Sequence, residues 1–304
     1  MMNKAKSGRL PGGRPPAAVE ITPEGVLGAV RRGGLGAAHP LDCAFAALPD
    51  GALVPGIDAP NLRAPEAVAA AIRSALGGLS TRSRAVTLVL PDTTVRVFVL
   101  DFDSLPSKPA EAIPVLRFRL RKMVPFDVEH AGVSYQVLSQ NKTECRVLAA
   151  ILPGPILAEY EAAVRAAGYE PGAVLPSSLA ALEAIDSLEA VLTANLSGQA
   201  LTTTIAAGED LLLYRTLDLP ETPAERIGEI QRGIAVAAAY FEDKLHARPQ
   251  RIYYAGNRSA SEVAAWIDNP DLDVVELTPP PENTDAALAA ASVAGVTGAL
   301  AGAG

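Results

Sequence analysis

Apolar and polar positions alternate along the chain in short runs that predict strands and amphipathic helices. The pattern is most regular over residues 86–138, where the turn formers Pro91-Asp92 separate two apolar runs. The order of the runs predicts two strands, a helix and a third strand, at residues 87–90, 95–100, 108–123 and 135–138.

The predicted helix over residues 108–123 carries apolar and basic side chains on different faces. Its apolar stripe consists of Ile113, Leu116, Leu120 and Met123, and its basic positions are Arg117, Arg119, Arg121 and Lys122. The helix should end at Val124-Pro125, because a residue that precedes proline is disfavoured in the α conformation. The stripe fits either a buried core or a binding groove, and the pattern leaves both open.

The chain on either side of this segment reads as two similar halves. The first begins with a predicted hairpin (17–21 and 26–30), sheet continuations at 43–47 and 53–54, and a helix at 65–76. After the central segment come a strand at 145–151 and helices at 155–167 and 177–185. The second half begins with three strands in meander order (191–196, 201–206, 211–217). It continues with helices at 225–245, 259–266 and 286–304 and strands at 251–254 and 274–277.

Two halves that each begin with a strand meander and continue into helix and strand predict a duplicated α/β fold. This is the order of elements in the core shared by actin, sugar kinases and Hsp70, with RNase H-like halves. The expected organisation is a disordered leader at 1–16, a first half at 17–185 and a second half at 186–304. A small subdomain at about 86–150 is inserted in the first half.

Composition narrows the class of protein. The 304 residues are 49% hydrophobic and 20% charged with a net charge of −8, typical of a globular protein and unlike the basic footprint of nucleic-acid binders. Cys43 and Cys145 lie far apart and are expected to be reduced thiols. The leader is basic and rich in Gly and Pro, without a signal-peptide core, which indicates a cytoplasmic protein. No apolar run is long enough to predict membrane insertion.

The central segment resembles the type IV pilus assembly protein PilM. The resemblance is carried by LPDTTVRVFVLDFDSLP followed by LRFRLRKMVPFDVEHAGVSYQVL, in which the order of elements matters more than any one residue. It implies an actin-like fold with an inserted subdomain over nearly the whole chain. It also implies a cytoplasmic scaffold, peripheral at the inner membrane, that binds the cytoplasmic N-terminal peptide of a PilN-like protein and couples to the pilus assembly ATPase.

The resemblance also implies where a nucleotide would bind, namely at three turns that face the cleft between the halves. At the first turn Glu20 stands where the family has Asp, and Thr22-Pro23 replaces Gly and Ser. Proline removes a backbone donor that a phosphate loop needs, and Glu24 adds a negative charge beside the expected phosphates.

The other two turns also depart from the family pattern. Asn195 replaces the Asp of the second turn, which keeps the small residues Ser197 and Gly198, and the third turn keeps Gly256 followed by Asn257. An amide supplies no negative charge to Mg²⁺ and cannot act as a base. The sequence therefore predicts a degenerate site in a pseudo-ATPase. The alternative that stays open is an actin-like switch that binds ATP and Mg²⁺ through Thr22, Glu24, Asn195, Ser197, Gly198, Gly256 and Asn257.

For the partner peptide, the predicted surface is the basic helix with Arg117, Arg121 and Phe126, which could hold acidic or carbonyl groups beside an apolar anchor. A solvated helix face is the simpler interpretation of the same cluster. His39, His130 and His246 lie at no metal-binding spacing, and the sequence contains no P-loop, GxSxG or GxGxxG motif. Two related families fit the sequence less well. FtsA ends in a basic amphipathic helix, whereas residues 286–304 contain no Lys or Arg. GspL would continue into a transmembrane helix, and no such segment is predicted here.

Overall fold

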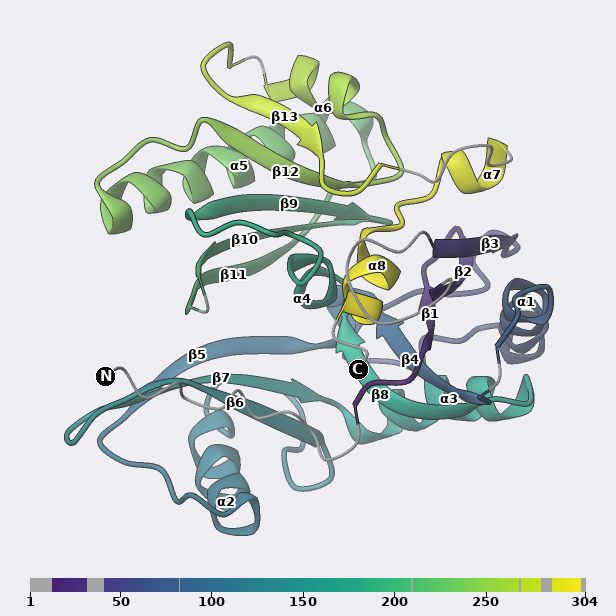
Figure 1. Ribbon diagram of the computed structural model, residues 1–304, viewed down its shortest axis with the longest axis horizontal. Helices are drawn as coiled ribbons and strands as arrows, with labels where there is room; N and C mark the ends of the chain where they lie inside the picture. Colours follow the sequence, from purple (N-terminus) through teal and green to yellow (C-terminus); the bar gives the residue numbers. More distant parts are fainter. Residues whose placement is uncertain are drawn as a thin grey trace.

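The computed structural model of the protein describes residues 13–31, 41–81, 83–208, 210–267, 269–279 and 286–301, without the side chain of residue 289. His39 and most of the predicted leader lie outside these residues. The described elements form three sheets, two of five strands and one of three (Figure 1).

The first sheet has the order β3-β2-β1-β4-β8. Its strands are β1 (Ala17–Ile21), β2 (Gly25–Arg31), β3 (Leu41–Ala47), β4 (Ala85–Leu90) and β8 (Glu170–Pro176). The first three form an antiparallel meander, and β4 and β8 then run parallel to β1. Residues 53–54, expected to continue this sheet, instead take part in an isolated bridge between Leu53 and Leu62.

Both faces of the first sheet are covered by helices. The helices α1 (Pro65–Gly77) and α3 (Gly154–Ala166) share one core with Ala17, Val19 and Ile21 of β1. Ala18, the alternate position of β1, packs in a separate core with α4 (Ser177–Leu182) and α8 (Ala294–Ala301). Because side chains alternate along a strand, Glu20 lies on the same face as Ala18, toward α8.

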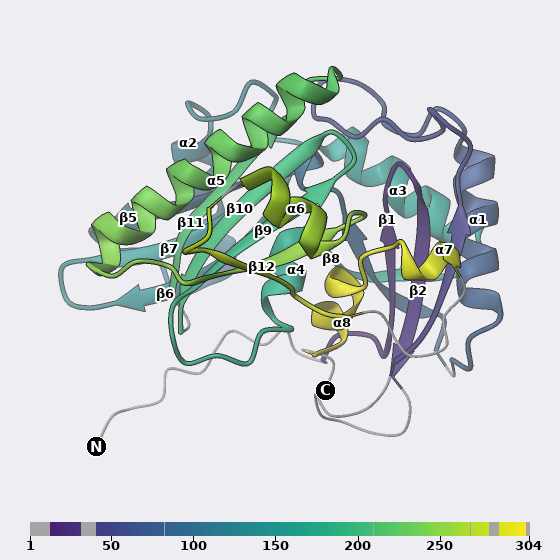
Figure 2. The ribbon, with the colours of Figure 1, turned by 90° about the horizontal axis from the view of Figure 1, so that it is seen from above.

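The second sheet has the order β11-β10-β9-β12-β13 and the same topology as the first. Its strands are β9 (Val191–Ser197), β10 (Ala200–Ala207), β11 (Asp210–Asp218), β12 (Arg251–Gly256) and β13 (Asp273–Glu276). The helices α5 (Pro223–Leu245) and α6 (Ala260–Ile267) cover its outer face (Figure 2). The repeated topology confirms the duplicated actin-like architecture that the order of elements predicted.

The third sheet, in the order β5-β7-β6, belongs to a small unit with its own core. Its strands are β5 (Arg96–Phe102), β6 (Gly132–Gln140) and β7 (Cys145–Leu152), and α2 (Pro109–Leu120) covers the face that points away from the second half (Figure 1). The small unit therefore begins at β5. The expectation that it starts near residue 86 is corrected, because β4 pairs in parallel with β1 in the first sheet.

The C-terminal segment also differs from the prediction. Instead of one helix over 286–304 there are two short ones, α7 (Ala286–Ala289) and α8, separated by residues 290–293. Both lie mainly against the first half: α7 contacts β3, and α8 contacts α4, β1, β2 and β4, while Ala294 at the start of α8 also packs with Ala255 of β12. The prediction assigned residues 286–304 to the second half, but α8 packs mainly against the first half.

The last residues of the predicted disordered leader, which was expected to extend to residue 16, are in contact with the first half. Arg14 forms two hydrogen bonds with the carboxylate of Glu183, at 2.6 and 2.5 Å, and Pro15 packs against Gly172 of β8. Residues 13–16 are therefore attached to the first half. Cys43 and Cys145 are free thiols, as expected. Among the described residues, no helix is both long and apolar enough to cross a membrane.

The contact between α8 and α4 predicts how the protein responds to added methyl groups. A Cβ at Gly298 would lie 1.7 Å from the carbonyl oxygen of Ala180, so Gly298→Ala should lower the free energy of unfolding by about 1–3 kcal/mol through overpacking. Gly228 of α5 has open space at the same position, and Gly228→Ala should raise it by about 0.5–1 kcal/mol. Urea unfolding of both variants measures the difference; equal effects would contradict the close approach of α8 to α4.

Candidate functional site in the cleft between the halves

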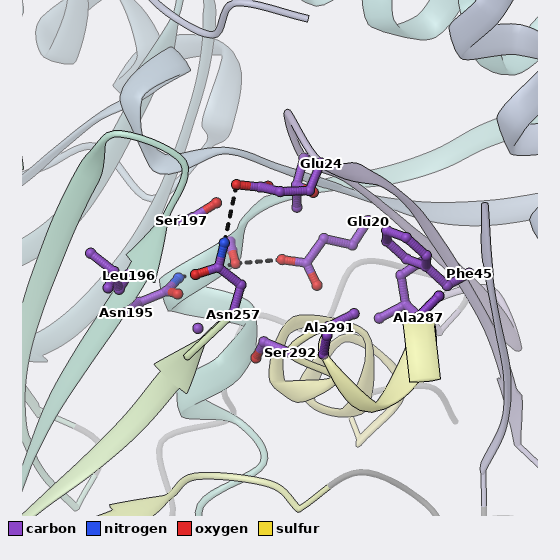
Figure 3. A pocket seen from close by; sticks show the side chains of 15 residues that line it. Glu20, Glu24, Phe45, Asn195, Leu196, Ser197, Asn257, Ala287, Ala291 and Ser292 are labelled. Atoms are coloured by element: carbon purple, nitrogen blue, oxygen red, sulfur yellow. Dashed lines mark hydrogen bonds between the residues drawn. The ribbon is translucent and has the colours of Figure 1, made fainter. Parts of the chain in front are cut away.

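A cavity of about 310 Å³ lies between the two halves, where three turns meet (Figure 3). The β1–β2 turn contributes Thr22 and Glu24, β9 and the turn after it contribute Asn195 and Ser197, and the end of β12 contributes Gly256 and Asn257. The segment after α7 closes one side through Ala290, Ala291 and Ser292. Six of the seven residues predicted for the nucleotide turns thus line one cavity.

The seventh, Gly198, lies where the two hairpin turns touch. Its φ is +56°, a conformation that suits glycine, and a Cβ there would lie 3.0 Å from Cγ of Pro23. At the cavity rim, Asn257 Nδ2 donates a 3.4 Å hydrogen bond to Glu24 Oε1. The first turn is therefore in contact with both of the others.

Glu20 is the most deeply placed acid of the cavity. Its side chain comes from the carboxyl-terminal end of β1, is 5% exposed, and accepts a 2.5 Å hydrogen bond at Oε1 from Ser177 Oγ. Its Oε2 accepts no hydrogen bond of normal geometry and faces Gly295 in the first turn of α8. Burial raises the pKa of Glu20 to about 7, against the lowering effect of the Ser177 hydrogen bond.

Beside the cavity, Asp92 is the centre of a buried hydrogen-bond network. It lies in the 3₁₀ turn η1 (Asp92–Thr94) directly after β4 and is 4% exposed. It accepts hydrogen bonds from Ser178 N (3.0 Å), Ser178 Oγ (2.5 Å) and Tyr214 Oη (2.6 Å). Tyr214 comes from β11, so the network joins the two halves.

Asn195 extends this network from β9. Its Nδ2 lies 3.1 Å from Ser177 Oγ, 3.0 Å from Ser178 Oγ and 3.3 Å from Asp92 Oδ2, and it donates to all three. The amide at the position of the family's metal-binding Asp therefore bonds to the first half of the fold. A carboxylate could not replace it, because it has no proton to donate when ionised.

Sequence reasoning missed Asp92, Ser177, Ser178 and Tyr214. Pro91-Asp92 was interpreted as a turn, and the two serines as the start of a helix. The available signal was their position: Glu20, Asp92 and Ser177 each follow the apolar run of β1, β4 or β8, and these parallel strands end at one edge of the sheet. Tyr214 gave no such signal, because its partner lies 122 residues away.

The residues present do not fit a magnesium nucleotide. The described residues that line the cavity include two glutamates and no Lys or Arg, so nothing among them compensates the charge of a triphosphate. Pro23 has no amide hydrogen to offer a phosphate, and its ring packs on the second hairpin turn. Within the described part of the chain, no group of three or more His, Cys, Asp or Glu side chains could hold a metal ion.

The residues predicted to bind a partner peptide have intramolecular contacts. Arg117 Nη2 donates a 2.8 Å hydrogen bond to the carbonyl oxygen of Ala131, Arg121 forms an ion pair with Glu129, and Phe126 packs against the core of the small unit. These contacts give each residue a structural role, and the peptide-binding role stays a prediction.

The exposed face of α2 carries a different set of side chains. Phe118 is 73% exposed, with Val115 and Met123 beside it, so Met123 does not share the buried stripe of Leu116 and Leu120 as predicted. Arg119 of α2 is also exposed, and Lys122 and Met123 belong to the exposed turn at residues 121–123 that follows the helix. We name the set of Val115, Phe118, Arg119, Lys122 and Met123 the outer face of α2.

The pKa of Glu20 predicts the pH dependence of stability. A carboxyl whose pKa rises from 4.5 in the unfolded chain to about 7 in the fold keeps its proton longer when folded, so its contribution to stability falls as pH rises from about 4.5 to 7. Glu20→Gln removes this titration. Relative to the variant, the parent protein should lose up to about 3 kcal/mol of unfolding free energy between pH 5 and pH 8. Urea unfolding at the two pH values tests this, and a constant difference would contradict it.

Comparison with known proteins identifies the fold. No protein-family model matches the sequence, and no curated protein matches it either. Among solved structures, the chain is similar to one in the PilM–PilN type IV pilus biogenesis complex, with a TM-score of 0.74 and 19% identity over 97% of this chain and 99% of that one.

Two further structures share the fold at lower similarity. The cytoplasmic domain of EpsL, an inner-membrane component of the type II secretion system of Vibrio cholerae, has a TM-score of 0.51 at 14% identity, covering 90% of this chain and 91% of its own. The ethanolamine utilization protein EutJ from Carboxydothermus hydrogenoformans has a TM-score of 0.50 at 7% identity, covering 97% and 92%. The resemblance to the PilM fold, first seen in the central segment, is thereby confirmed over nearly the whole chain.

Proposed function

We propose that this chain is a scaffold of a type IV pilus, or of a related secretion machine, that binds the cytoplasmic N-terminal peptide of a PilN-like membrane protein. The observation that carries the proposal is its likeness to a chain of the PilM–PilN complex over almost the full length of both. In this role the chain is cytoplasmic and reaches the inner membrane through its partner. The pilus assembly ATPase is a second proposed partner.

The chemistry of the cleft supports a role without catalysis. Asn195 donates its amide hydrogens within the fold, and the described residues of the cavity offer two carboxylates where a nucleotide needs cations. The alternative is an actin-like switch that binds or hydrolyses ATP with the same residues. Its support is the placement of three turns around one cavity, as a nucleotide site requires.

Calorimetric titration separates the scaffold from the switch. Mg·ATP at millimolar concentration should give no binding heat and no thermal shift, because like charges repel in the cavity and Pro23 supplies no donor. The variant Glu24→Gln, which removes one negative charge at the rim of the cavity, serves for comparison. Micromolar binding of Mg·ATP to the parent protein would favour the switch.

The outer face of α2 is the surface that suits a peptide best. Phe118 offers an exposed aromatic anchor, and Arg119 and Lys122 can pair with acidic side chains or donate hydrogen bonds to carbonyl oxygens. Arg117, Arg121 and Phe126 are instead engaged in the intramolecular contacts described above. We therefore place the partner peptide across the outer face of α2, with Phe118 as its main contact.

Peptide capture tests this placement. Fluorescence anisotropy with a labelled peptide from the cytoplasmic N-terminus of a PilN protein should show at least a tenfold loss of affinity for Phe118→Ala, as truncation of an anchor residue commonly costs more than 1 kcal/mol. Arg119→Glu should weaken binding further. Leu188→Ala is the matched control, since Leu188 is 97% exposed and lies outside α2.

The same assay can contradict the placement. Unchanged affinity of both α2 variants, together with weaker binding by Arg121→Ala, would move the peptide to the surface first predicted from the sequence. Arg117 is unsuitable for this comparison, because its loss would remove the hydrogen bond to Ala131 and lower the melting temperature.

A further inference from the structure

The cavity between the halves has two chemically different walls. One is apolar, formed by Leu27 of β2, Phe45 of β3 and the alanines of and after α7 (Figure 3). The other carries carboxylates, hydroxyls and amides. A cavity of about 310 Å³ with this division suits a small molecule that has an apolar body and one polar end.

The polar wall is rich in acceptors that carry negative charge. Glu20 lies at the inner end and Glu24 at the exposed rim, and no described lining residue is a Lys, Arg or His. Figure 3 shows the carboxylate of Glu20 pointing from β1 toward the centre of the ring of lining residues. Its Oε2 accepts no hydrogen bond of normal geometry although the side chain is 5% exposed, and the backbone N–H of Val296 in α8 lies close enough to the carboxylate to lower its pKa.

An acceptor buried without a partner costs free energy, and a donor supplied by a ligand would recover it. A cationic donor would gain further, because an opposite charge favours the ionised carboxylate. An uncharged donor can supply the hydrogen bond but not the attraction between opposite charges, and an anionic ligand would be repelled by two glutamates. Phe45 can also contribute, since an aromatic ring attracts a nearby ammonium group or stacks on an apolar body.

We infer that this cavity binds a small organic cation, a primary ammonium group joined to a short apolar body. The ammonium group lies between Glu20 and Glu24, and the apolar body lies against Leu27 and Phe45. This inference goes beyond the proposed scaffold role and does not depend on it, because the cavity and the outer face of α2 belong to different parts of the fold.

The probe for the test is 2-phenylethylamine, with 2-phenylethanol and 3-phenylpropionate as neutral and anionic counterparts of similar shape. Calorimetry on the full chain at pH 8 should show binding of the amine, at least tenfold weaker binding of the alcohol and no binding of the acid. Glu24→Gln should weaken the amine about tenfold, and Phe45→Ala should weaken amine and alcohol alike. Glu66→Gln, at an exposed carboxylate in the first turn of α1, is the matched control.

The pH dependence of amine affinity is a second measurement, and a purely structural role of Glu24 would not change it. Glu20 faces Ser177 of α4 and the first turn of α8 and feels the charge of Asp92, and its carboxyl loses its proton near pH 7. The amine stays charged through this range, so its affinity should rise between pH 6 and pH 8, and Glu20→Gln should abolish the rise.

Three results would overturn the inference. The first is no detectable binding of the amine at 10 mM, a dissociation constant that corresponds to a binding free energy of about 3 kcal/mol. The second is equal binding of the acid, and the third is an amine affinity that Glu24→Gln leaves unchanged. If Glu20→Gln does not fold, Glu24→Gln alone decides, since its side chain is exposed. Failure here leaves peptide capture by α2 untouched, and failure of peptide capture leaves amine binding untouched, so the two proposals are tested separately.

Discussion

The arrangement of the two halves depends on one buried carboxylate. Asp92 directly follows β4 of the first half and accepts hydrogen bonds from Ser178 of α4 and from Asn195 and Tyr214 of the second half. A charge this deeply buried is stable only while its partners stay in place. Any rotation that opens the cleft would separate it from Asn195 and Tyr214. The network therefore fixes the angle between the halves, and with it the shape of the cavity.

The same network explains why the changes at the three turns occur together. In an actin-like nucleotide site, the carboxyl ends of the central strands face phosphates and metal. Here the amide of Asn195 points to serine hydroxyls, Glu20 bonds to Ser177, and Pro23 packs against the neighbouring turn. Several groups that could meet a nucleotide therefore have partners within the chain, and those of Asn195 and Pro23 join the two halves.

Much of the fold could be predicted from the sequence, because the strands of both meanders are marked by local signals. The apolar runs at 17–21 and 191–196, the turn formers that follow them and the helical spacing within 225–245 all depend on neighbouring residues. The three turns around the cavity were predicted through the resemblance to PilM. Predictions failed where a distant partner decides: β4 joins the first sheet by pairing with β1, and α8 packs on the half farther away in sequence. Phe118 was not recognised as exposed, since α2 has apolar residues on both faces.

The position of α8 has a consequence for how the chain folds as it is made. This helix covers Ala18, Leu27 and Ala29 of the first sheet, yet it is synthesised only after the strands and helices of the second half. Until it emerges, the apolar face of the first sheet stays open to water and to other chains, and Glu20 has no helix beside it. Contacts between the two ends of a chain form slowly, because a long loop must close before they are made. The first sheet is thus completed only after the second half has been made, and a chain without α8 would expose the apolar residues that this helix covers.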